Sequence, residues 1–186
     1  MSGPYRLRCR RKRYSNVASV PEKPTAEKEN RVILCVATHV GMRFYERIEP
    51  ITAELVPLSH DLLFYLKHSE EREREKECEA FREHFERYCE LIKDLKNENL
   101  IHQSYIPIEV FTAFSAVVKQ MQDDANYWFD MAKLLFAGEY DKIDYDKGKA
   151  AVDMLLMHLA AAEIEVKKRL KLLCGDFRRF LRGSVN

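Results

Sequence analysis

Residues 107–138 have the sequence PIEVFTAFSAVVKQMQDDANYWFDMAKLLFAG, and this stretch by itself indicates the fold class. Between Pro107 and Gly138 it contains neither glycine nor proline, the two residues that are most unfavourable inside an α-helix. Pro107 suits the first turn of a helix, and Gly138 suits the position just after the last turn. Apolar residues recur at steps of three and four, which places them on one helix face: Val110, Phe114, Val117, Met121, Ala125, Trp128, Ala132 and Leu135. The stretch therefore predicts one long amphipathic helix.

A second stretch of the same character precedes it. Glycine and proline are also absent from residues 58–106. Within them lies an apolar stripe with alternating steps of three and four, the spacing of a helix that packs along its neighbours at a shallow angle. The stripe comprises Cys78, Phe81, Phe85, Tyr88, Ile92 and Leu95. We expect this helix to end near residues 97–99.

The last long helix is predicted from about Lys149 to Cys174, with Gly175 as its C-terminal cap and one more amphipathic turn beyond it. It carries two apolar stripes. The first comprises Val152, Leu155, Leu159, Ala162, Val166, Leu170 and Leu173, and the second comprises Ala150, Met154, Met157, Ala161 and Ile164. Because two stripes make a wide apolar surface, we expect this helix to be the most buried of all.

The first ordered segment is predicted as a helix over residues 26–48. Its apolar residues recur at steps of three or four: Ile33, Val36, Val40, Phe44 and Ile48. A strand over residues 32–40 is the competing interpretation, because this run is β-branched and Gly41 follows it; the helix is favoured. Pro50 is expected to end or kink this element. A short helical turn at residues 51–56 and a new segment capped by Ser59 are expected to follow.

Residues 70–77 have the sequence EEREREKE and carry only charged side chains. A helix there cannot be buried over two turns. The segment is either a solvated bridge within one long helix or follows a break near His68 and Ser69. Together these patterns predict an all-α protein: an elongated bundle of four long helices plus short helical segments, formed by residues 25–182, with residues 183–186 as a flexible C-terminus.

The N-terminal 24 residues differ from the rest in charge. Seven basic residues against the single acid Glu22 give +6, so the remaining residues of this chain of net charge +1 sum to −5. Low apolar content and several prolines predict a disordered arm. Its basic cluster is the candidate binding site: Arg6, Arg8, Arg10, Arg11, Lys12 and Arg13. Such a cluster is typical of a nuclear import signal, a nucleic-acid contact or an anionic-membrane contact, and a solubilising tail is the alternative. Ser15 is a candidate phosphorylation site, because the basic residues before it suit basophilic kinases.

No catalytic or metal-binding signature is present in the sequence. None of the six histidines follows a glutamate by three residues, the pattern that a di-iron bundle needs, and Asp141, Asp144 and Asp146 lack the spacing of a calcium loop. There is no glycine-rich phosphate loop and no nucleophile motif. We therefore expect no cofactor, no metal and no enzymatic activity.

The five cysteines and the hydropathy indicate the compartment. The cysteines are odd in number and irregularly spaced, which argues against a disulfide framework and favours a reducing compartment. The longest apolar run, residues 32–37, is far too short to span a membrane, and the N-terminus lacks the apolar segment of a secretory signal. We expect a cytoplasmic or nuclear protein that is neither secreted nor transmembrane.

The functional hypothesis from the sequence is a non-enzymatic helical-bundle adaptor or assembly subunit. It would bind protein partners through the bundle surface, and the basic arm would add nuclear targeting or a phosphate-bearing partner. A peripheral membrane protein that dimerises into an elongated rod is the first alternative, and a carrier of an apolar ligand such as a lipid is the second. A monomer is favoured over a dimer, because aromatic residues in the 78–95 stripe fit an intramolecular bundle better than a two-stranded coil.

Overall fold

The computed structural model describes the backbone of residues 26–70 and 73–183, and the side chains of residues 39–70, 73–172 and 175. The described chain contains no strand, and the all-α prediction is confirmed. Its elements are α1 (Ala26–His68), α2 (Arg74–His102), α3 (Ile108–Ala137), the short 3₁₀-helix η1 (Tyr140–Lys142) and α4 (Tyr145–Gly183).

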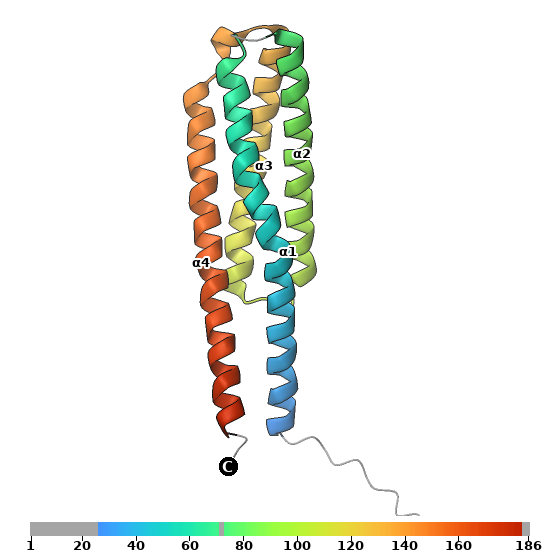
Figure 1. The fold of residues 1–186 in the computed structure, drawn as a ribbon, viewed down its shortest axis with the longest axis vertical. Coiled ribbons are helices and arrows are strands. Elements are labelled where there is room, and N and C mark those ends of the chain that lie inside the picture. The colour runs from blue at the N-terminus through green and yellow to red at the C-terminus, as the bar shows by residue number, and fades with distance from the viewer. Residues whose placement is uncertain (1–25, 71–72, 184–186) are drawn as a thin grey trace, which may run out of the picture.

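The four long helices form an elongated up-and-down bundle (Figure 1). Each helix packs against the next one along the chain, and α4 closes the ring by packing against α1. Helix α1 has 43 residues and α4 has 39, whereas α2 has 29 and α3 has 30. Because of this difference in length, α1 and α4 extend beyond the connection between α2 and α3. At a rise of ~1.5 Å per residue, α1 is about 65 Å long.

The structure corrects the expectation for the first segment. Residues 32–40 are helical, as favoured, but Pro50 does not end the helix, and Ser59 caps no new one. Both Pro50 and Pro57 lie inside α1. Both prolines are exposed, so the carbonyl groups one turn before them, which lose their usual N–H partner, lie on the side that faces water. Ser59 is buried, and its hydroxyl donates to the carbonyl of Leu55 within the helix.

Of the two alternatives for residues 70–77, the structure has the break near His68 and Ser69, since α1 ends at His68 and α2 begins at Arg74. The expectation that residues 70–77 stay unburied fails at Glu77, which lies on the buried side of the first turn of α2 next to Cys78. The predicted end at residues 97–99 is also too early, because α2 continues to His102. Asn99 is buried there, and its amide donates to the hydroxyl of Ser115 at 3.1 Å.

The connection from α3 to α4 follows local chemistry. Gly138 adopts φ 73°, and its N–H bonds to the carbonyl groups of the last turn of α3, as predicted for a C-terminal cap. Arg74, at the start of α2, donates to the carbonyl of Phe136. The carboxylate of Asp144 accepts from the backbone N–H of Lys147 at 2.9 Å, which caps the start of α4.

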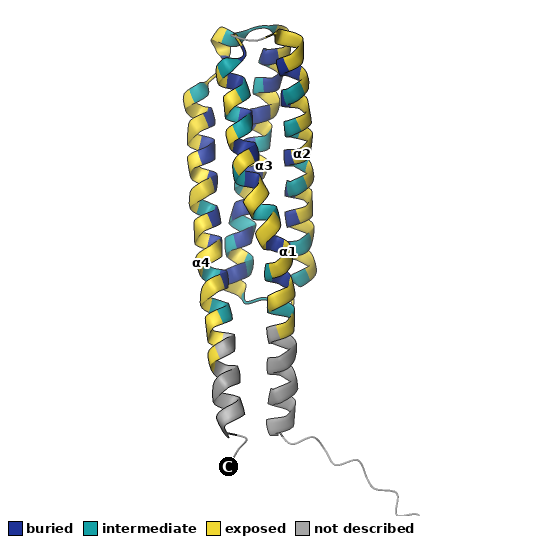
Figure 2. Ribbon diagram, in the orientation of Figure 1, coloured by how far each residue is buried: buried dark blue, intermediate teal, exposed yellow. Residues whose placement is uncertain are grey.

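The core runs along the bundle axis, as the buried residues in Figure 2 show. Its largest fully buried side chains are Trp128, Tyr88, Phe44 and Phe81. Among the predicted stripes on α2 and α3, only Phe85 and Ala125 are half-buried rather than buried. Phe85 stacks between Phe81 on its own helix and Phe129 on α3.

The predicted bounds of the last helix are wrong at both ends. The helix begins at Tyr145, four residues before Lys149, so Gly148 lies in its first turn. It then passes through Cys174 and Gly175 and ends at Gly183, so Gly175 caps nothing. A glycine can end a helix but does not have to, and no proline or glycine follows Gly175 until Gly183.

We predict opposite effects from adding a methyl group at Gly148 and at Gly175 of α4. Gly175→Ala should raise the free energy of unfolding by about 0.5–1 kcal/mol, because alanine favours helix and no atom lies within 4 Å of the added Cβ. Gly148→Ala should lower it, because the Cβ would lie 2.8 Å from the hydroxyl of Tyr127. Denaturant unfolding measures both. A destabilised Gly175→Ala protein would contradict the continuous helix.

Candidate functional site

The basic residues Arg6, Arg8, Arg10, Arg11, Lys12 and Arg13, together with Ser15, lie outside the residues that the structure describes. The candidate sites described below therefore lie on the surface and in the cavities of the bundle. Three of them adjoin α4: an apolar stripe, an acidic groove and an apolar cleft.

The second predicted stripe of α4 is exposed, which corrects the expectation that this helix is the most buried. We name it the outer stripe; it comprises Ala150, Met154, Met157, Ala161 and Ile164. Met154, Met157 and Ile164 are 42%, 56% and 53% exposed, and Leu172, which continues the stripe, is 58% exposed. The first stripe is buried against α1 and α3 over residues 152–166, and Leu170 is half-buried. In the described part of the chain, no segment covers the outer side of α4 (Figure 2).

The spacing of the outer stripe is that of a helix-pairing seam. Its members alternate steps of four and three, and Lys168 takes the next position. Charged side chains flank the seam, among them Asp153 and Lys167 on the side toward α1. Lys167 pairs with Glu163 one turn earlier, and Lys168 pairs with Glu165 at 2.6 Å. Such exposed pairs within one helix are weak, so these lysines can exchange partners at little cost.

An acidic groove lies beside the outer stripe, between α3 and α4. It has a volume of about 490 Å³, and α4 lines it with Lys147, Ala150, Ala151 and Met154. Three aspartates of α3 line the opposite wall: Asp123, Asp124 and Asp130. Asp124 is buried and accepts a hydrogen bond from the amide of Gln120 at 2.8 Å. Burial raises the pKa of Asp124 from its ordinary 3.8 to about 6, and the hydrogen bond opposes that rise.

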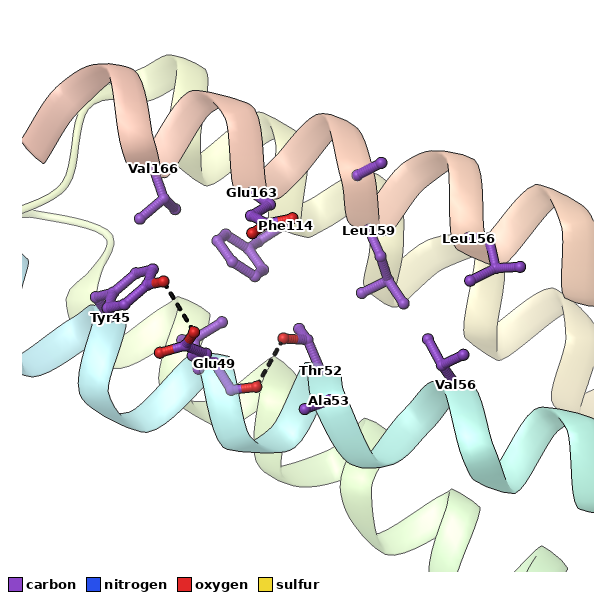
Figure 3. Close-up of a pocket in the computed structure, with 12 residues that line it drawn as sticks. Tyr45, Glu49, Thr52, Ala53, Val56, Phe114, Leu156, Leu159, Glu163 and Val166 are labelled. Carbon is purple, nitrogen blue, oxygen red and sulfur yellow. Dashed lines mark hydrogen bonds between the residues drawn. The ribbon is translucent and has the colours of Figure 1, made fainter. Parts of the chain in front are cut away.

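An apolar cleft lies on the other side of α4, where this helix faces α1 (Figure 3). Its volume is about 330 Å³. The walls are mostly apolar, and the polar groups are Tyr45, Glu49 and Thr52 of α1 and Glu163 of α4. The hydroxyl of Tyr45 donates to Glu49 at 2.9 Å. This hydrogen bond to a carboxylate, together with burial, raises the pKa of Tyr45.

A polar cluster lies inside the bundle, away from these surfaces. Tyr88 of α2 is fully buried, and burial raises the pKa of its hydroxyl. The nearby side chains of Ser59 on α1 and Trp128 on α3 partly offset that rise. Because these groups come from three helices, the cluster fixes how the helices are aligned rather than offering a route to solvent.

The remaining reactive side chains do not form a site in the described part of the chain. Burial raises the pKa of the thiols of both Cys78 and Cys89, so both thiols stay protonated at neutral pH. Among the described residues, no group of His, Cys, Asp and Glu is arranged to hold a metal ion. None of the helices over these residues is long and apolar enough to cross a membrane.

Comparison with known proteins identifies no relative: no family model, no curated protein and no solved structure matches the chain. The function is therefore inferred from the residues and their arrangement.

The sequence contained part of the signal for these sites. The outer stripe was visible as a helical period, but that period does not say which of two stripes is covered. The cleft joins residues more than 100 positions apart, such as Glu49 and Glu163, so no local pattern reveals it. Asp124 could have been noticed, because it lies within one turn of Met121 and Trp128 on a predicted buried face.

We predict that Asp124 makes stability fall with rising pH. Because its pKa in the folded protein lies above its ordinary value, its contribution to stability is fully present below pH 4 and is lost as the pH rises through 6. Asp124→Asn should keep the hydrogen bond from Gln120 without the buried charge. At pH 7 it should be about 1–3 kcal/mol more stable than the original protein, and at pH 4 about equally stable.

Urea unfolding at the two pH values measures this difference. Asp130→Asn is the matched control, because Asp130 lies in the same groove but is exposed and is not among the charges that raise the pKa of Asp124; it should leave the pH dependence unchanged. An Asp124→Asn protein that keeps the pH dependence of the original would show that the buried carboxyl is not its source.

Proposed function

We propose that this protein is a non-enzymatic adaptor or assembly subunit that binds a helical protein partner through the outer side of α4. One observation supports this most: the outer stripe, with apolar side chains at helix-pairing spacing, faces water along four turns of α4. Apolar residues at that spacing suit the insertion of a second helix.

The energetics favour a covered stripe. Burying a side chain of the size of methionine or isoleucine contributes about 1.5–3 kcal/mol, and the stripe has Met154, Met157 and Ile164 exposed. Methionine is also unbranched and polarizable, so it adapts to a partner surface. Contiguous exposed apolar surface with charged flanks is characteristic of an interaction site rather than of an inert surface.

The basic arm completes the proposal. We propose that residues 6–13 either direct the protein to the nucleus or bind a phosphate-bearing partner, since arginine matches phosphate with two parallel hydrogen bonds. On this proposal the protein acts in the cytoplasm or the nucleus.

Affinity capture tests the α4 surface. Proteins are captured from an extract with the tagged protein and, in parallel, with its Met157→Glu/Ile164→Glu variant. The extract also contains untagged copies of this chain. We expect the variant to capture at least about tenfold less of every specific partner, because burying a carboxylate in the interface costs several kcal/mol. Ile101→Glu is the matched control: Ile101 is equally exposed but lies at the far end of α2. If the double variant captures the same proteins as the original, the proposal is wrong.

The apolar cleft between α1 and α4 supports a second candidate, a carrier of an apolar ligand. Its volume falls at the lower end of the range for small-molecule sites, and its walls are mostly apolar. Native mass spectrometry of the purified protein separates the two functions. A carrier should retain a bound small molecule that Ala53→Trp displaces by filling the cleft, whereas an adaptor should show none and should keep its protein partners in that variant.

A further inference from the structure

We propose that the partner of the outer stripe is a second copy of this chain, paired antiparallel about a two-fold axis next to Ala160. This inference rests on the proposed function, in that it identifies the occupant of the same surface. Two features of α4 agree on one register.

The first feature is the match of large and small side chains. In an antiparallel pair centred next to Ala160, Met154 lies opposite the partner's Ile164, and Ala161 lies opposite the partner's Met157. Each small residue then meets a large one, which fills the space between the helices. A parallel pair would instead place Ala161 against the partner's Ala161, leaving a gap between the helices.

The second feature is charge. In the antiparallel register, Asp153 faces the partner's Lys167. The two-fold axis repeats this contact, so two complementary contacts flank the apolar seam. Ala160 meets the partner's Ala160 at the axis, where its small side chain lets the helices approach. In the parallel register, Lys167 would face the partner's Leu172, so both of these contacts between Asp153 and Lys167 would be lost.

Exchange of charges tests this register. Sedimentation equilibrium from micromolar to submillimolar concentration should show that the full-length protein dimerises. Asp153→Lys and Lys167→Asp should each weaken the dimer by about tenfold, because two attractive contacts become repulsive. An equimolar mixture of the two variants should dimerise within about threefold of the original protein, since the heterodimer pairs Lys with Asp at both positions.

Lys93→Asp is the control, because it makes the same charge change on α2, which does not pack against α4, and it should dimerise like the original protein. The inference would be overturned if the original protein stayed monomeric at all concentrations. It would also be overturned if the mixture dimerised no more tightly than either variant alone. If self-association fails while the Met157→Glu/Ile164→Glu variant still loses captured proteins, the proposed function stands and only this partner is wrong. If both experiments fail, both proposals fall.

Discussion

In a ring of four helices, each helix can bury only the side that it turns toward the bundle axis, and this limit governs how the surface of the protein is organised. Helices α1, α2 and α3 keep most of their large apolar side chains on that side, and they surround Trp128, Tyr88 and Phe81. Helix α4 has apolar residues on two opposite sides. One side completes the core, so the other side must face water in the single chain.

Much of the fold followed from the sequence because each helix has a strong one-sided period. The stripes of α2 and α3 predicted the core, and Gly138 predicted the end of α3, since a left-handed residue is needed there. Local signals failed where neighbouring helices outweighed them. Pro50 sits within α1 because its lost hydrogen bond lies on the solvent side, while Ile48 and Leu55 on the same helix are buried in the core.

The candidate sites were harder to predict, because each depends on which helices are neighbours. The stripe on α4 was recognised, but its exposure follows from the position of α4 in the ring, which periodicity does not encode. The acidic groove requires Asp123 and Asp130 of α3 to lie beside Ala150 of α4. The most specific sequence feature, the basic cluster at residues 6–13, lies outside the described residues and stays a prediction.

The interface and its direction can be tested together by measuring one distance. A spin label is placed at residue 171, which is exposed on α4, in a variant whose five native cysteines are replaced. Our account places the partner's residue 171 opposite residue 147, 24 residues along the helix. At ~1.5 Å per residue, the two labels of an antiparallel dimer should be about 35–40 Å apart by pulsed electron paramagnetic resonance. A separation below about 20 Å, which a parallel pair would give, or the absence of any distance between chains at submillimolar protein, would contradict it.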